Sequence, residues 1–156
     1  MISKYKKELT VSSVFILLPA FVSLAVPGLR SLWLLCLSLL AGQWLCFLIC
    51  AADPGNQGRN EKPLRLVLWI MPAVSFLCTG ILYAVSAGLS LSVGRVTTLA
   101  LGLMFIAIGN YLPKCRRNYT VGIKVRWTLA SDENWNATHR FAGRVWVIGG
   151  IAVMLA

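Results

Sequence analysis

Four long apolar segments constrain the fold of this chain more than any other feature. They are Leu9–Val26, Leu32–Ala51, Leu66–Val85 and Val96–Leu112. A helix that crosses the hydrocarbon core of a bilayer needs about 20 mostly apolar residues, and each segment approaches that length. Because 58% of the 156 residues are hydrophobic and 13% are charged, the sequence predicts an all-α integral membrane protein, with residues 1–156 as a single membrane domain.

A fifth apolar run begins near Phe141 and continues to Ala156. Its roughly 16 residues are at the short edge of spanning length. Two interpretations stay open: the run reaches the far membrane surface at Ala156, or the chain is a truncated six-helix bundle that lacks its last helix. The lack of a polar flank after the run favours the second interpretation. We therefore predict five transmembrane helices in this chain.

The distribution of lysine and arginine predicts the orientation of these helices. Taken together, these basic residues are abundant before the first span and in the second and fourth connections, whereas only Arg30 and Arg95 lie in the first and third. Cytoplasmic loops carry such an excess, so the N-terminus and residues 113–140 are expected in the cytoplasm. Attraction to anionic lipids accounts for the net charge of +10, and no direct nucleic-acid partner is expected.

The fourth connection, residues 113–140, carries most of the side chains that could act in recognition. Within it Tyr119, Val121, Ile123, Val125 and Trp127 alternate with polar residues. An alternation with a period of two predicts an extended strand with one apolar face. We expect this strand to form part of a cytoplasmic, interfacial segment between the fourth and fifth helices.

The second half of the same connection predicts a helix that begins at Ser131. Serine is a favourable N-cap, and Asp132 and Glu133 follow in the first turn, where the helix dipole favours anions. Trp135 and His139 then share one face of this helix because they are four residues apart. His139 is therefore expected near the membrane boundary, facing back toward the strand.

Catalysis is one interpretation of the lone histidine. His139 with Asp132, Glu133 or Thr138 could act as a general base. However, no serine or cysteine nucleophile stands in a recognisable motif, and one histidine cannot anchor a usual zinc site. We expect a protein that is not an enzyme, with no catalytic residue, no metal and no cofactor.

Binding is the interpretation that suits the mixture of aromatic, basic and amide side chains in residues 113–140 better. The alternative is an interfacial strap whose aromatic residues lie at lipid headgroups and whose bases contact phosphates. The expected ligand is a peptide, a lipid headgroup or a cytoplasmic protein. The residues that we assign to ligand or partner binding are Asn118, Tyr119, Gly122, Lys124, Arg126, Trp127, Thr128, Trp135, Thr138, His139 and Arg140.

Few polar side chains lie within the predicted spans. Gln43 is the only amide in the second span, and both a hydrogen bond between helices and a ligand contact remain open for it, the first being favoured. Gly80, Ala84 and Gly88 give the third span a smooth face for close helix packing. No ionisable residue lies near the centre of a span, which weighs against an ion-coupled transporter.

Several short motifs together resemble the SdpI family of bacterial membrane proteins. They are Gly109-Asn110-Tyr111-Leu112-Pro113-Lys114, Asn118-Tyr119, Gly122-Ile123-Lys124, Trp127-Thr128-Leu129 and Trp135-Asn136-Ala137-Thr138-His139-Arg140 with Gly143. Asp53-Pro54 after the second span also resembles the family pattern. The resemblance implies a multi-pass protein of the bacterial cell membrane with about six spans. It also implies immunity to a secreted peptide toxin, and signalling that draws a transcriptional repressor to the membrane.

Two positions depart from the family pattern. Arg126 stands where the family usually carries a proline before the tryptophan, and the connection Pro27–Ser31 is shorter than the outer loop of many members. If that loop recognises the toxin, this chain recognises a different toxin or none.

The sequence thus predicts an immunity or sensor protein against an antimicrobial peptide. The alternative is a small-molecule or lipid-binding membrane transporter with a cavity lined by Gln43, Trp127 and His139. The sequence does not indicate the oligomeric state.

Overall fold

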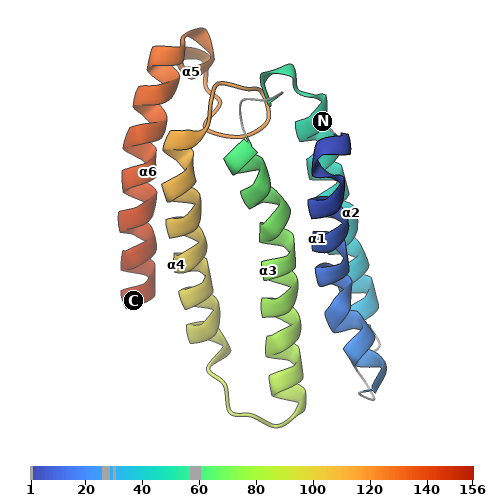
Figure 1. Cartoon of the computed structure of the whole chain (residues 1–156). Coiled ribbons are helices and arrows are strands. Elements are labelled where there is room, and N and C mark those ends of the chain that lie inside the picture. The colour runs from blue at the N-terminus through green and yellow to red at the C-terminus, as the bar shows by residue number, and fades with distance from the viewer. Residues whose placement is uncertain (1, 26–28, 30, 57–60) are drawn as a thin grey trace. The chain divides into compact units, whose positions relative to one another are not determined.

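The computed structural model describes all residues except 1, 26–28, 30 and 57–60. The expected short connection Pro27–Ser31 lies largely outside the described residues. Within them the chain is helical, and the elements follow the order of Figure 1. The α-helices are α1 (Ile2–Val22), α2 (Leu32–Ala52), α3 (Glu61–Ser86), α4 (Val93–Tyr111), α5 (Arg126–Ala130) and α6 (Asp132–Leu155), with 3-10 turns η1 (Ser23–Ala25), η2 (Pro54–Asn56) and η3 (Leu112–Lys114).

The all-α class predicted from the sequence is confirmed. Among the described residues, three helices are long and apolar enough to cross a membrane, namely Leu32–Ala52, Leu64–Ser86 and Val93–Lys114. Helices α1 and α6 begin with charged residues, among them Lys6 and Lys7 in α1 and Asp132 and Glu133 in α6. The chain is a membrane protein by these helices, and the count of five spans stays a prediction.

The described chain divides into two compact units, and the first consists of Met1–Ala51 and Leu64–Leu91. Its small core contains Ile16, Ala20 and Cys36. Hydrogen bonds from polar side chains join its helices. The amide of Gln43 on α2 donates to the hydroxyl of Ser12 on α1 at 2.7 Å. Gln43 therefore makes a contact between helices, where both polar groups are buried.

Helix α3 bonds to α1 close to a proline in α1. The hydroxyl of Tyr83 donates to the carbonyl of Pro19 at 2.5 Å, and that of Ser75 donates to the carbonyl of Ile16 at 3.0 Å. Both acceptors belong to the helical turn that contains Pro19, which has no N–H to donate. These hydroxyl donors from α3 thus join α3 to α1 beside the proline.

The second unit consists of Ala52–Pro63 and Ser92–Ala156. Within it α4 and α6 pack antiparallel, with Gly102 opposite Gly150 and Gly109 opposite Gly143. A Cβ atom on Gly143 would lie 2.7 Å from the carbonyl oxygen of Gly109. The two backbones can therefore touch only because these positions lack side chains, as is common between membrane helices.

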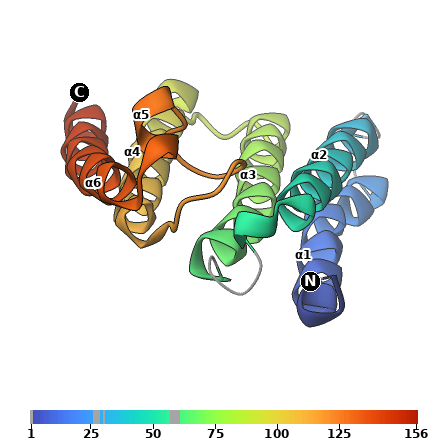
Figure 2. The ribbon, with the colours of Figure 1, turned by 90° about the horizontal axis from the view of Figure 1, so that it is seen from above.

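The polar part of this unit lies where α4 ends and α6 begins. Figure 2 looks down on this end, where α5 lies close to the first turns of α6. The helices α4 and α6 are thus the rigid support, and the connection between them carries the site.

Candidate functional site

The strand predicted for residues 119–127 is wrong. Residues 119–122 form bends, residues 123–125 are irregular, and Arg126 and Trp127 already belong to α5. The chain turns at Gly122, whose φ of +124° is unfavourable for residues with a side chain. The alternation of apolar and polar residues therefore belongs to an irregular loop, in which Tyr119 and Trp127 are exposed and Val121, Ile123 and Val125 are half-buried.

Asn118 organises the first part of this loop. Its side-chain oxygen accepts from the backbone N–H groups of Thr120 at 2.9 Å and Val121 at 2.6 Å. Its side-chain amide donates to the carbonyls of Arg116 at 2.7 Å and Val121 at 2.9 Å. Asparagine is suited to such turns because its amide mimics a peptide group. The buried Asn118 therefore acts as a structural centre of the loop.

The connection after α2 fastens this loop from the other side. The buried carboxylate of Asp53 accepts from the N–H of Tyr119 at 2.7 Å and from the hydroxyl of Thr120 at 3.1 Å. Its second oxygen accepts from the N–H of Gly55 at 2.8 Å. Asn56 donates to the hydroxyl of Thr120 at 2.6 Å. A buried carboxylate is tolerated here because several donors surround it.

The second part of the loop rests on α6 through His139. The N–H of Ile123 donates to Nε2 of His139 at 3.0 Å, and Nδ1 lies 2.8 Å from the carbonyl of Trp135. Nε2 must be the unprotonated nitrogen because it accepts, so the proton sits on Nδ1 and is donated to the carbonyl. The imidazole is neutral in this arrangement.

The indole of Trp135 completes the buried support under the loop. Its Nε1 donates to the carbonyl of Cys115 at 2.8 Å, and its ring stacks on that of His139 with centroids 4.1 Å apart. A Cβ atom on Gly122 would lie 2.5 Å from Nε2 of His139 and 3.0 Å from the Trp135 ring. Glycine is therefore required both for the turn and for the close approach.

Burial lowers the pKa of His139, and the hydrogen bond to the Trp135 carbonyl partly opposes this shift. Protonation would place a second N–H against the N–H of Ile123. Because both ring nitrogens are engaged by backbone groups, the imidazole is a structural support and has no nitrogen available to take a substrate proton. Burial likewise raises the pKa of the nearby Cys115 thiol to about 11, which leaves it unreactive at neutral pH.

Thr128 fixes the start of the short helix α5. Its hydroxyl accepts from the N–H of Val125 at 3.0 Å and lies 2.9 Å from the carbonyl of Ile123. Arg126 occupies the first position of α5, after Val125 in an extended conformation with φ −124° and ψ 162°. The first helical position tolerates proline, since its N–H has no partner within the helix. The structure thus explains how Arg126 can replace the proline of the family pattern.

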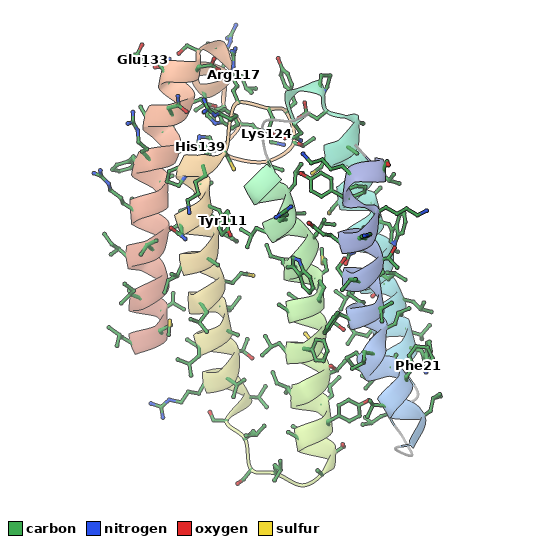
Figure 3. The ribbon with its side chains drawn as sticks, in the orientation of Figure 1. Phe21, Tyr111, Arg117, Lys124, Glu133 and His139 are labelled. Carbon is green, nitrogen blue, oxygen red and sulfur yellow. The ribbon has the colours of Figure 1, made fainter. Side chains whose placement is uncertain are left out.

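The helix start predicted at Ser131 is confirmed. Its hydroxyl accepts from the N–H of Asn134 at 3.1 Å, and α6 begins at Asp132. Arg117 pairs with the carboxylate of Asp132 at 2.7 Å and donates to the carbonyl of Leu129 at 2.8 Å. Figure 3 shows Arg117 beside the start of α6, with Glu133 in the first turn of that helix.

The remaining predicted residues lie on the surface of the loop. Tyr119 is 71% exposed and Trp127 is 62% exposed, although both are large aromatic side chains. Lys124, labelled in Figure 3, donates to the carbonyls of Tyr119 at 3.1 Å and Thr120 at 3.2 Å. Arg126 and Arg140 are also exposed. The site is thus a buried hydrogen-bonded scaffold that presents an aromatic and basic surface.

Comparison with known proteins places this segment in a family. Residues 114–156 match the SdpI/YfhL protein family. Over this segment the chain is similar to the SdpI/YfhL family. A curated relative, the "Immunity protein SdpI" of Bacillus subtilis (strain 168), is 28% identical over 69 residues, which are 44% of this chain and 33% of that protein. The aligned part thus spans about a third of the relative's length. No solved structure gives a significant match.

The predicted site residues divide into two groups in the structure. Asn118, Gly122, Thr128, Trp135 and His139 build the scaffold, and the others, with Thr138 half-buried, lie nearer the surface. The sequence assigned no binding or structural role to Asp53, Gly55 or Asn56, so their part in holding the loop was missed. The signal for Asp53 was its presence in the family pattern, whereas its contact with Tyr119 across 66 positions could not be read from the sequence.

Proposed function

We propose that this chain is a bacterial membrane immunity or sensor protein that confers resistance to a secreted antimicrobial peptide. The observation that carries the proposal is the family match over residues 114–156, which contains the loop, α5 and α6. The relative named as an immunity protein supports the same role. The polar segment at residues 113–140 is then the functional centre.

The geometry supports recognition by this segment. Tyr119 and Trp127 are held in exposed positions by a loop whose backbone donors are bound to Asp53, Asn118 and His139. A rigid loop loses little conformational freedom when it binds a partner. Exposed tryptophan, tyrosine and arginine are the side chains that contribute most often to binding energy in protein interfaces.

The distribution of lysine and arginine supports a cytoplasmic location for this segment. In that orientation the segment can act in two ways. It can respond to a peptide that reaches it through the membrane, or it can bind a cytoplasmic regulator such as a transcriptional repressor. An enzymatic role is not proposed, because the imidazole of His139 is engaged on both nitrogens.

A transporter with a cavity lined by Gln43, Trp127 and His139 is not favoured. The ring of His139 is covered by Trp135 and the Gly122 turn, whereas the side chain of Trp127 is 62% exposed. Gln43 donates to Ser12 inside the first unit. No specific observation among the described residues favours transport.

The test is protection of a sensitive bacterium. The full chain is produced in the membrane of a strain that is killed by secreted peptide toxins, and survival is measured across a panel of such toxins. Protection against one or more toxins, with no change for unrelated antibiotics, is the expected result. Unchanged killing across the panel, with the chain present in the membrane, would remove the immunity proposal.

A cytoplasmic partner is tested separately by affinity capture. Tagged chain is isolated from membranes of cells that also produce a candidate repressor, and capture is compared with an Arg126→Ala, Trp127→Ala double variant. The proposal expects the repressor to be retained by the wild type and lost with the variant. Equal retention by both proteins would place the contact elsewhere.

A further inference from the structure

The α4–α6 pair carries an open hollow of about 490 Å³ on its outer surface, next to the polar segment. Asn110 and Pro113 contribute to it from the end of α4, and Arg140, Arg144, Val147 and Ile148 contribute from α6. The floor is made by Gly109 and Gly143, where the two helices touch. The hollow exists because these glycines leave no side chains to fill the space beside the crossing.

Two arginines make one end of this hollow strongly positive. Arg140 and Arg144 are four residues apart on α6, so their side chains lie on the same face of the helix. Both are exposed, and among the described residues neither takes part in an ion pair. Arg140 donates one bond from Nε to the carbonyl of Asn136 at 3.3 Å, which leaves its terminal nitrogens for a ligand.

The other end of the hollow is aliphatic. Val147 and Ile148 follow one turn after Arg144, and Ile148 is 68% exposed. Along α6 the lining therefore changes from guanidinium groups to hydrocarbon within two turns. A ligand that fits both ends carries a phosphate and an alkyl chain in that order.

We propose that this hollow binds one anionic phospholipid of the surrounding bilayer. Guanidinium groups bind phosphate oxygens with two parallel hydrogen bonds, and the amide of Asn110 can bond to the rest of the headgroup. The acyl chains then lie along Val147 and Ile148. The site is independent of the proposed immunity function, since lipid binding requires neither a toxin nor a cytoplasmic partner.

The position of Arg144 supports a lipid over a free anion. It lies inside the apolar run that begins at Phe141, and a charge in such a run is unfavourable without a counter-charge or access to the headgroups. A lipid phosphate provides that counter-charge at the boundary where the run begins. A net anionic lipid also matches two neighbouring positive charges better than a zwitterionic lipid does.

Lipid titration of the purified full chain in a neutral detergent tests the site. Native mass spectrometry measures the binding of dioleoyl phosphatidylglycerol and dioleoyl phosphatidylcholine to the wild type, to Arg140→Gln with Arg144→Gln, and to Arg95→Gln. Arg95 is the matched control because it lies near the other end of α4. One phosphatidylglycerol is expected to bind at least tenfold more tightly to the wild type and to Arg95→Gln than to the double variant.

Three results would refute the proposed lipid site. They are equal binding of phosphatidylglycerol to the double variant, equal binding of phosphatidylcholine to the wild type, and displacement of the lipid by millimolar inorganic phosphate, which would indicate a site for a free anion. Circular dichroism verifies that each variant is folded. If the double variant does not fold, the single variants Arg144→Lys and Arg140→Gln decide. Each is expected to weaken phosphatidylglycerol binding, and unchanged binding in either variant refutes the proposal.

Discussion

Replacement of Gly122 by alanine perturbs the centre of the buried scaffold with a single carbon atom. The added Cβ would lie 2.5 Å from Nε2 of His139 and 3.0 Å from the ring of Trp135. Neither ring can move freely, because Trp135 is bonded to the Cys115 carbonyl and His139 to the Trp135 carbonyl. The loop must therefore move away from α6.

Two contributions set the size of this effect. A residue with a side chain at φ +124° is strained by about 1–3 kcal/mol. Loss of the hydrogen bond between the Ile123 N–H and His139 adds about 1–3 kcal/mol, because both groups are then left without their partner. The free energy that holds the loop on α6 should fall by about 2–6 kcal/mol.

Hydrogen exchange of peptides from residues 115–130 measures this directly in the detergent-solubilised protein. A loss of about 2 kcal/mol corresponds to roughly 30-fold faster exchange through local opening, and larger losses to more. Gly149→Ala is the matched control, because nothing lies within 4 Å of the added carbon on α6. Exchange that stays unchanged in Gly122→Ala would refute the assigned contact between the loop and His139.

Three further substitutions or conditions test separate parts of the scaffold. Asp53→Asn places an amide N–H against one of the N–H groups from which the carboxylate now accepts a hydrogen bond, so the free energy that holds the loop should fall by about 1–3 kcal/mol. Cys115 should then become at least about fivefold more reactive to alkylation, measured by peptide mapping. Unchanged reactivity would show that Asp53 does not hold the loop. Arg126→Pro should leave the melting temperature unchanged or raise stability by about 0.4–1 kcal/mol, since Val125 is already extended as a residue before proline must be; a clear fall would contradict the helix start. Because burial depresses the pKa of His139 below its ordinary 6.5, the imidazole binds a proton more readily when the loop is open. The free energy that protects the loop from hydrogen exchange should be complete above about pH 6.5 and fall below that pH by at most about 1.4 kcal/mol per pH unit. His139→Gln should abolish this pH dependence.

Hydropathy predicted the helices well because a membrane-spanning helix needs only local information. The predicted segment Leu32–Ala51 differs from α2 by one residue, and the predicted fifth helix begins at its Ser131 cap. Periodicity failed in the loop for a physical reason. A strand requires backbone partners in a neighbouring strand, whereas here the backbone donors are taken by the side chains of Asp53, Asn118 and His139.

The sequence predicted which residues belong to the candidate site, but not the structural role of each residue. The family motif identified Gly122, Trp135 and His139, yet their contact depends on a positive φ and on a register between loop and helix that no local pattern encodes. The glycine pairs of α4 and α6 show the same limit. Gly109 and Gly143 were visible as motif residues, but their direct opposition follows from the packing of two helices far apart in sequence.

Survival of a sensitive bacterium that produces the Trp127→Ala variant tests the central claim most directly. The substitution removes an exposed side chain and keeps the backbone carbonyl of Trp127, which accepts from the side-chain amide of Asn134 at 3.3 Å. The loop should therefore keep its wild-type hydrogen exchange. The matched control is Trp44→Ala, an exposed tryptophan on α2. The account predicts that Trp127→Ala is folded and present in the membrane but no longer protects against the toxin that the wild type resists, while Trp44→Ala still protects. Full protection by Trp127→Ala would contradict recognition by the exposed surface of residues 113–140.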